Sequence, residues 1–305
     1  MGSPAGERVG ISPADRMLAL GEALRPKQWI KNGVLFAGLI FALRLSDQRA
    51  VLQAAWAFVV FCAISSAGYM FNDLADVEQD RRHPRKRLRP LASGRLHRGH
   101  VIGMGVGLLV VGLGGSALLG FRFFLLTLGY AALNFAYNAG LKHTVLVDVF
   151  ALASFFVLRM IAGAVAIDVP ISPWLYICTI LAALFLGLAK RRHELILLGD
   201  DASSHRQILS EYSSALLEQL ITIVTASLVM AYSLYTFSAE NLPRDHSMMV
   251  TVPIVLFGIF RYLYLVHRRE GGGAPEELLL GDRPLLVTVV LLAATWVAVL
   301  YLWAR

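Results

Sequence analysis

Nine apolar runs recur along the 305-residue sequence, and most are long enough to cross a bilayer. Lipid offers no water to the backbone, so runs of this kind predict transmembrane α-helices. Hydrophobic residues make up 57% of the sequence and charged residues only 16%, which is too little charge for a soluble protein. We predict an all-α, polytopic membrane protein with nine transmembrane helices, at residues 33–45 (extended backwards by 23–32), 51–71, 101–119, 121–138, 145–166, 172–189, 214–236, 247–266 and 284–303.

The predicted domain organisation is simple. Residues 1–22 are polar and contain no short apolar core with a cleavage site, so we expect a cytoplasmic tail rather than a signal peptide. The end of this tail, Pro13 to Leu24, is expected to form a short interfacial helix. Residues 23–305 are predicted to form a single transmembrane catalytic domain, because no connection between the runs is long enough for a soluble domain.

The charge distribution predicts an orientation. The formal net charge is +7, and basic residues crowd alternate connections, including 72–100, 190–213 and 267–283. The positive-inside rule places these connections and the amino terminus in the cytoplasm, and the carboxyl terminus outside. We therefore expect a multi-pass protein of the cell (inner) membrane with its active site on the cytoplasmic face. The basic excess suits anionic lipids or substrates better than nucleic acid.

An acidic and then basic segment, NDLADVEQDRRHPRKRLRPLASG, follows the second apolar run directly. Its residues Asp73, Asp76 and Asp80 are spaced so that one helix would present all three on one side. Three adjacent carboxylates repel one another unless a cation lies between them. A solvated helix end is the alternative, but charge at the edge of a span is costly and tends to be functional. The segment therefore predicts a Mg²⁺ site formed by these three residues, with Asn72 contributing a neutral oxygen.

Basic residues near this acid segment are candidate phosphate ligands. Lys86, Arg87 and Arg89 lie between two prolines, which would hold them in a fixed turn over the site, and the first two are the candidate ligands. The stretch LRPKQWIKN (24–32) supplies Lys27, and Arg25 as a weaker candidate. An interfacial anchor is the alternative for this stretch, and the two roles are compatible.

Further candidates lie in and around the later spans. Asp148 and Arg159 share one span, so they either pair with each other or take functional roles. KRRHE (190–194) either fixes the topology or binds the phosphate of a second substrate, with Glu194 as a base or hydroxyl acceptor. The candidate catalytic residues are Asp73, Asp76, Asp80 and Asp148, and the candidate substrate-binding residues are Lys27, Asn72, Lys86, Arg87, Tyr137, Lys142, Arg159, Lys190, Arg191, Arg192 and Glu194.

At these residues the sequence resembles the UbiA superfamily of intramembrane prenyltransferases, whose members have nine transmembrane helices. The NDxxDxxxD motif of that superfamily matches residues 72–80, and its YxxxLK motif matches residues 137–142. Aromatic prenyltransferases of the superfamily carry a second aspartate-rich motif after the sixth span. This sequence has KRRHEL (190–195) there, which is a departure from their pattern.

With KRRHEL at this place, the sequence resembles the branch of the superfamily called decaprenyl-phosphate phosphoribosyltransferase. LRPKQWIKN (24–32), DRxHPxKxxRP (80–90) and LLGDRPLL (279–286) resemble the same branch. The resemblance implies Mg²⁺, a phosphoribosyl diphosphate donor and a polyprenyl (decaprenyl) phosphate acceptor. It implies a product that is a precursor of arabinofuranose donors for cell-wall arabinan.

Three alternatives remain at this stage. An aromatic prenyltransferase of the same superfamily, with a prenyl diphosphate donor, is the strongest of them. A transporter of anionic solutes would be expected to carry its carboxylates near the bilayer midplane rather than at one edge. A CDP-alcohol phosphatidyltransferase would need Gly-Ala-Arg within its acidic motif, which is absent here. The sequence leaves the oligomeric state open, a homo-oligomer included.

Overall fold

The computed structural model describes residues 12–84, 86–198, 207–239, 242–268 and 275–303, and every regular element within these ranges is helical. The elements are α1 (Pro13–Ala23), η1 (Pro26–Phe36), α2 (Ala37–Phe41), α3 (Gln48–Ala75), α4 (Val77–Arg82), η2 (Lys86–Leu88), α5 (Arg98–Ala117), α6 (Phe121–Ala139), η3 (Leu141–His143), α7 (Val147–Ala166), α8 (Pro173–Leu198), η5 (Gln207–Glu211), α10 (Ser214–Ser238), η6 (Ser247–Thr251), α11 (Val252–Arg268), α12 (Pro275–Gly281), α13 (Arg283–Val297) and η7 (Ala298–Trp303).

Seven helices in the described residues are long and apolar enough to cross a membrane. They correspond to α3, α5, α7, α8, α10, η6–α11 and α13–η7. The two other predicted runs, 33–45 and 121–138, fall mainly on α2, which follows η1, and on α6. The prediction of an all-α membrane protein is confirmed, whereas the count of nine spans is not.

The short helix expected at the end of the tail is present as α1. Ser12 caps it, because the Ser12 hydroxyl accepts a hydrogen bond from the Asp15 backbone N–H at 3.1 Å. Ala19 and Ala23 are buried in one hydrophobic cluster with Met70 of α3. Residues 1–11 of the predicted tail lie outside the described residues.

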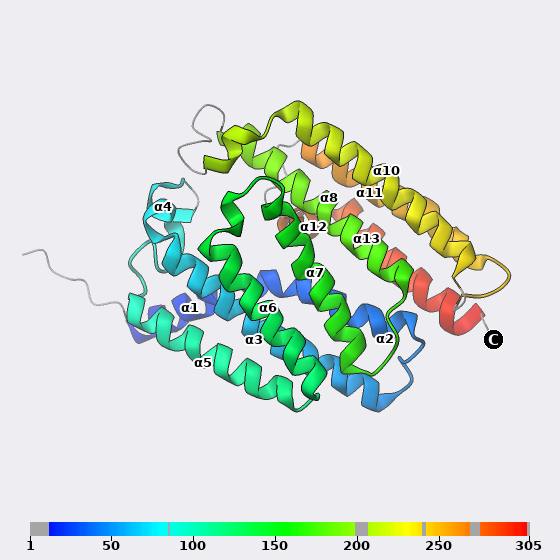
Figure 1. The fold of residues 1–305 in the computed structure, drawn as a ribbon, viewed down its shortest axis with the longest axis horizontal. Coiled ribbons are helices and arrows are strands. Elements are labelled where there is room, and N and C mark those ends of the chain that lie inside the picture. Colours follow the sequence, from blue (N-terminus) through cyan, green and yellow to red (C-terminus); the bar gives the residue numbers. More distant parts are fainter. Residues whose placement is uncertain (1–11, 85, 199–206, 240–241, 269–274, 304–305) are drawn as a thin grey trace, which may run out of the picture.

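Helix α7 is the central element of the bundle (Figure 1). It packs against α3, α6 and η1 on one side and against α8 on the other. Its Gly163 allows the closest backbone approach in this packing, since a Cβ atom there would lie 2.0 Å from the Leu35 carbonyl oxygen of η1. Gly163 thus lets η1, an unusually long 3₁₀ segment, lie directly against α7.

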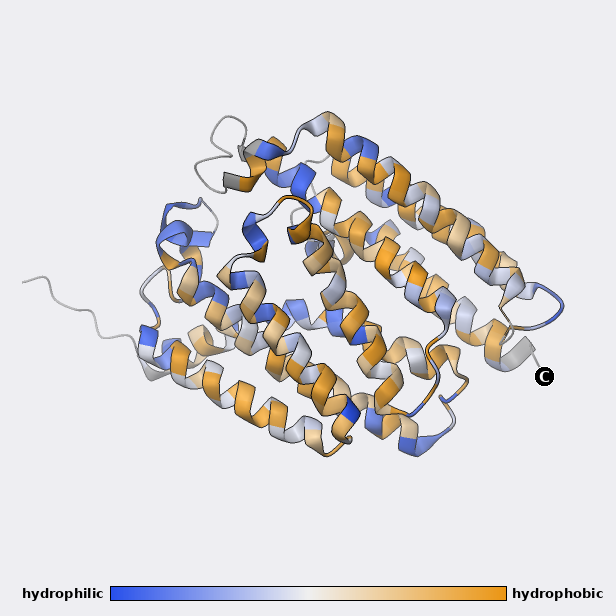
Figure 2. Cartoon of the chain, in the orientation of Figure 1, coloured by the Kyte–Doolittle hydropathy of each residue, from blue (hydrophilic) through white to orange (hydrophobic). Residues whose placement is uncertain are grey.

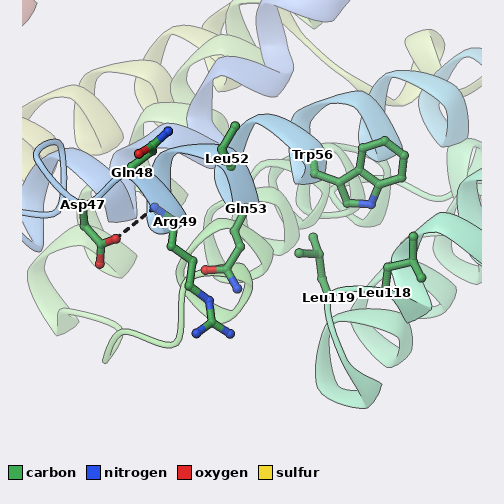
Figure 3. A pocket seen from close by; sticks show the side chains of 8 residues that line it. All are labelled: Asp47, Gln48, Arg49, Leu52, Gln53, Trp56, Leu118 and Leu119. Carbon is green, nitrogen blue, oxygen red and sulfur yellow. Dashed lines mark hydrogen bonds between the residues drawn. The ribbon is translucent and has the colours of Figure 1, made fainter.

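The two ends of the bundle differ in polarity. Hydrophilic segments gather at the end that holds α4, η3 and the carboxyl-terminal part of α8 (Figure 2). At the start of α3, around Asp47, lies an open depression of about 710 Å³, lined by Asp47, Gln48, Arg49, Leu52, Gln53, Trp56, Leu118 and Leu119 (Figure 3). Trp56 is the lining residue of α3 nearest to the acidic end, and it lies 17 residues before Asp73, so about 25 Å along the helix separates the two at 1.5 Å per residue.

Candidate functional site

The predicted acidic helix is interrupted at its middle carboxylate. Helix α3 ends at Ala75, Asp76 has φ −99° and ψ 8°, and α4 begins at Val77. The prediction that one helix presents Asp73, Asp76 and Asp80 on a single side is therefore wrong. Asp76 thus lies at the break, with Asp73 on α3 before it and Asp80 on α4 after it.

Asp73 and Asp80 are nevertheless brought together by an arginine. Both are buried, at 5% and 3% exposure, and Arg89 Nη1 lies 3.1 Å from Asp73 Oδ1 and 2.6 Å from Asp80 Oδ2. Asp73 Oδ1 also accepts a hydrogen bond from Arg25 Nη2. We call these four residues the acid cluster. Its two carboxylates lie on either side of one cationic nitrogen.

Asp76 has a different cationic partner. Lys142 Nζ, on η3 beyond the end of α6, lies 2.6 Å from Asp76 Oδ1. Lys142 is buried, so this contact ties the connection after α6 to the break between α3 and α4. Among the described residues, no three His, Cys, Asp or Glu side chains converge in a way that could hold a metal ion. In place of the expected site of three carboxylates, Asp73 and Asp80 share one arginine, and Asp76 pairs separately with Lys142.

Arg25 reaches the acid cluster from an unusual backbone conformation. It has a φ of 54° in the left-handed region, which is strained for a residue with a side chain, and it immediately precedes η1. Its guanidinium lies 5.0 Å above the centre of the Tyr69 ring. The start of η1 is fixed to α3, because Trp29 donates to the Ser66 hydroxyl at 3.0 Å and that hydroxyl donates to the Leu24 carbonyl at 2.8 Å.

Sequence reasoning ranked Arg25 behind Lys27 and did not single out Arg89. The structure leaves Lys27 exposed at the start of η1, whereas Arg25 and Arg89 contact the carboxylates. One local signal was available for Arg89, since Pro90 directly follows it and fixes its backbone. Asn72 is half-buried beside Asp73, and its carbonyl accepts from the Asp76 N–H at 2.9 Å.

Lys86 and Arg87 are exposed on η2, beside the acid cluster. Lys86 is surrounded by protein atoms although water reaches it, and the resulting loss of hydration, together with nearby Arg89, lowers the pKa of its ammonium group. The charges of Glu194, Asp80 and Asp76 act on it in the opposite direction. Lys86 therefore lies within electrostatic reach of both α4 and the end of α8.

A second polar group, which we call the buried network, lies between α7 and α8. Asp148 and Arg191 are both fully buried, and Arg191 Nε lies 2.5 Å from Asp148 Oδ2. Arg191 also donates to Glu194, and to the Tyr137 hydroxyl at 3.2 Å. Tyr212 donates to Asp148 Oδ1 at 2.8 Å, and its burial, with this bond to Asp148, raises the pKa of its hydroxyl to about 12.

Of the two alternatives for Asp148 and Arg159, the pairing of one with the other is not found, because each has other partners. Arg159 Nε donates to Asn32 at 2.7 Å, its Nη1 donates to the Phe155 carbonyl at 3.0 Å, and its Nη2 donates to Tyr130. The guanidinium also lies 4.8 Å from the centre of the Tyr130 ring. Arg159 thus links η1 to α6 and α7 through neutral partners.

The basic triplet on α8 points in several directions. Arg191 belongs to the buried network, while Arg192 Nη2 lies 2.9 Å from Glu218 on α10. Lys190, which directly precedes them on the helix, is half-buried. The structure therefore does not present the three basic side chains as one exposed patch.

Sequence reasoning missed a third contact, between α12 and η1. Glu276 is buried and accepts a hydrogen bond from Gln28, and Lys31 Nζ lies 3.0 Å from Glu276 Oε2. Burial acts to raise the pKa of Glu276, but Lys31 and Gln28 outweigh it, so the pKa is lower than usual. The connection before the last span thereby holds the segment that carries Arg25.

The family model described as UbiA prenyltransferase family matches residues 33–281. The chain belongs to the UbiA prenyltransferase family. A curated relative, "Decaprenyl-phosphate phosphoribosyltransferase" from Corynebacterium glutamicum, is 36% identical over 93% of this chain and 85% of its own length. A protein of the same name from Mycobacterium tuberculosis (strain CDC 1551 / Oshkosh) is 34% identical over 94% of each chain.

The fold of this UbiA family member is also found among solved structures. A UbiA homolog from Archaeoglobus fulgidus bound to GPP and Mg²⁺ superposes with a TM-score of 0.72 at 19% identity. The match covers 93% of this chain and 99% of that one. The likeness establishes the UbiA fold.

Proposed function

We propose that this protein transfers a 5-phosphoribosyl group from phosphoribosyl diphosphate to a polyprenyl phosphate and releases diphosphate. The observation that carries the proposal is the similarity, over more than nine-tenths of this chain, to relatives named for that activity. The residues agree with it, because one acid cluster suffices for one diphosphate group. The basic KRRHEL stretch stands where a second aspartate-rich motif would serve a prenyl diphosphate.

The acid cluster has the donors that Mg²⁺ prefers. Asp73 and Asp80 each place a carboxylate oxygen against the same cationic nitrogen, so a smaller cation could contact both. Magnesium in such sites takes one or two carboxylates and completes its shell with water and phosphate oxygens. Asp73 and Asp80 would hold the ion, with Asp76 and Asn72 beside it. When bound, Mg²⁺ would neutralise the charge that grows on the departing diphosphate.

The remaining residues would bind and orient the two substrates. Lys86, Arg87 and Lys27 are exposed around the acid cluster and would bind the 5-phosphate of the donor. Lys190 would attract the phosphate of the lipid acceptor. That phosphate is already anionic, so it needs no strong general base, and in-line attack on C1 of the ribose would invert this centre. We propose that the active site faces the cytoplasm of the cell (inner) membrane.

The buried network would act indirectly in this reaction. Asp148 is fully buried beside Arg191, so we assign it the role of holding Arg191, and through it Tyr137 and Glu194, in place. Arg159 would hold η1 in the same way through Asn32. The residues that touch substrate would then all lie at the polar end of the bundle.

One assay tests the proposal. Purified full-length protein in nanodiscs, supplied with Mg²⁺, radiolabelled phosphoribosyl diphosphate and a polyprenyl phosphate, is expected to yield a labelled lipid and free diphosphate. A chelator should stop the reaction, and excess Mg²⁺ should restore it. Consumption of a prenyl diphosphate with an aromatic acid, and none of the phosphoribosyl donor, would instead show an aromatic prenyltransferase. The lipid product is expected to serve as a cell-wall arabinan precursor.

A further inference from the structure

The acidic end of α3 is electrically balanced by the protein's own side chains. Each carboxylate of the segment has a basic partner among the described residues, and none depends on water alone for compensation. The three acids are Asp73, Asp76 and Asp80, and their three partners are Arg25, Arg89 and Lys142. A metal ion entering this site therefore adds positive charge to a group that is already neutral.

The same geometry places the arginines in competition with a metal. Arg89 Nη1 contacts the two carboxylates that would hold the ion, at 3.1 Å and 2.6 Å, and Arg25 contacts one of them. A divalent cation between Asp73 and Asp80 would repel both guanidinium groups at short range. The arginines would then need another anion, because partly buried charges without partners are costly.

A diphosphate is the anion that this arrangement can accept. It carries more negative charge than one divalent ion neutralises, and the planar fork of a guanidinium matches phosphate oxygens. The Arg25 and Arg89 side chains are 20% and 25% exposed, so both reach the surface at the polar end of the bundle. Arg25 also has a left-handed backbone, which is strained for a residue with a side chain.

We propose that Arg25 and Arg89 are diphosphate ligands that occupy the carboxylates until a metal ion and a diphosphate arrive together. Metal and diphosphate then bind with strong positive coupling, and each is bound weakly alone. The inference rests on the proposed function only in taking a diphosphate group to be part of the substrate. By linkage, each partner must raise the affinity of the other by the same factor.

The first measurement is the binding of Mn²⁺ alone, followed by electron paramagnetic resonance on full-length protein in nanodiscs. The wild type is expected to bind the ion weakly. Arg89→Gln frees two carboxylates and should bind Mn²⁺ about tenfold more tightly, within the usual range of coupling between sites. Arg25→Gln frees one contact and should show a smaller gain. Asp73→Asn should abolish binding in either background.

The second measurement is the binding of radiolabelled inorganic diphosphate at fixed Mg²⁺. Here Arg89→Gln should lose about tenfold in affinity, the opposite direction to its effect on Mn²⁺. Arg81→Gln is the matched control, since Arg81 lies in the same segment but pairs with Glu78 at 2.9 Å outside the acid cluster. It should change neither affinity.

Opposite signs separate the proposal from a structural role. A misfolded Arg89→Gln variant would lose affinity for both Mn²⁺ and diphosphate. In that case Arg89→Lys, which keeps the charge but not the planar fork, is the variant to measure. It should show a smaller gain in Mn²⁺ affinity and a smaller loss in diphosphate affinity. Tight Mn²⁺ binding by the wild type without diphosphate, or an unchanged Mn²⁺ affinity in folded Arg89 variants, would overturn the proposal. Both probes are independent of phosphoribosyl transfer, so a failed transfer assay with these shifts intact would refute the proposed function alone.

Discussion

The acid cluster and the buried network use the same residue types in opposite ways. Both join aspartates to arginines that come from distant parts of the chain. In the buried network the Asp148 and Arg191 side chains have no exposed surface, and a tyrosine completes the carboxylate shell. In the acid cluster the arginines remain partly exposed, and one nitrogen serves two carboxylates.

This difference separates an ion pair that supports the fold from one that can exchange partners. A fully buried pair that loses one member leaves an uncompensated charge, so its partners are fixed. A pair at the rim can trade its guanidinium for a metal ion while water and ligand phosphates supply the missing contacts. We therefore expect the acid cluster to serve chemistry and the buried network to serve stability.

The largest effect is expected from Asp73→Asn, which removes charge from the acid cluster without changing the side-chain volume. Transfer activity should fall about a thousandfold, since stabilisation of the leaving group is lost. The unfolding midpoint should fall less than in Asp148→Ala below, because Arg89 keeps Asp80 as a partner and the Arg25 and Arg89 side chains are partly exposed. Steady-state kinetics beside denaturant titration in mixed micelles would check this, and retained activity would exclude Asp73 as a metal ligand.

Asp148→Ala should act chiefly on stability. It leaves Arg191 buried with Glu194 and Tyr137 as remaining partners, and the free energy of unfolding should fall by about 3 kcal/mol. The same mixed-micelle titration measures the loss. A double variant, Asp148→Leu with Arg191→Met, should recover most of the stability, since apolar replacements of buried pairs are tolerated. If Asp148→Ala is as stable as the wild type, the buried network does not support the fold.

Gly163→Ala tests the packing that holds η1 between the two groups. The added methyl group would lie 2.0 Å from the Leu35 carbonyl oxygen, so the backbone of η1 or α7 must move. We expect a loss of about 2 kcal/mol in unfolding free energy, as for other overpacked sites. Gly107→Ala on α5 is the control, because nothing lies within 4 Å of its added Cβ. Equal stability of the two variants would contradict the close approach.

The smallest effect is expected from Glu276→Gln, at the contact between α12 and η1. The pKa of Glu276 is lowered in the folded protein, so its ion pair with Lys31 stabilises the fold above the ordinary glutamate pKa. At pH 7 the free energy of unfolding of the wild type should exceed that of the variant by about 1 kcal/mol. That difference should shrink as the pH falls below about 4. A difference that persists at low pH would contradict the ion pair.

Much of the fold could be predicted from the sequence. Each apolar run falls on helical elements, because a backbone in lipid has few other ways to satisfy its hydrogen bonds. The break at Asp76 could not be predicted, since residues 72–82 contain neither glycine nor proline. The break coincides with a contact from Lys142, which lies 66 residues further along the chain.

The sequence indicated which polar segments gather at one end of the bundle, but not how their side chains pair. The acidic segment and its basic neighbours do form the polar end of the bundle. Asp148 and Arg159, however, are eleven residues apart on one helix, which separates them by about 16 Å along its axis. Arg191 reaches Asp148 from the neighbouring helix α8 instead. Such partners depend on how helices are arranged in space, which local spacing does not encode.

The bond between Trp29 and Ser66 also gives the molecule an internal optical reporter. The sequence has five tryptophans, and Trp29 is fixed at the segment from which Arg25 extends to Asp73. The emission wavelength of an indole depends on the polarity and the hydrogen bonds around it. Replacing the other four tryptophans with phenylalanine would leave a fluorophore whose colour follows the arrival of ligand a few side chains away.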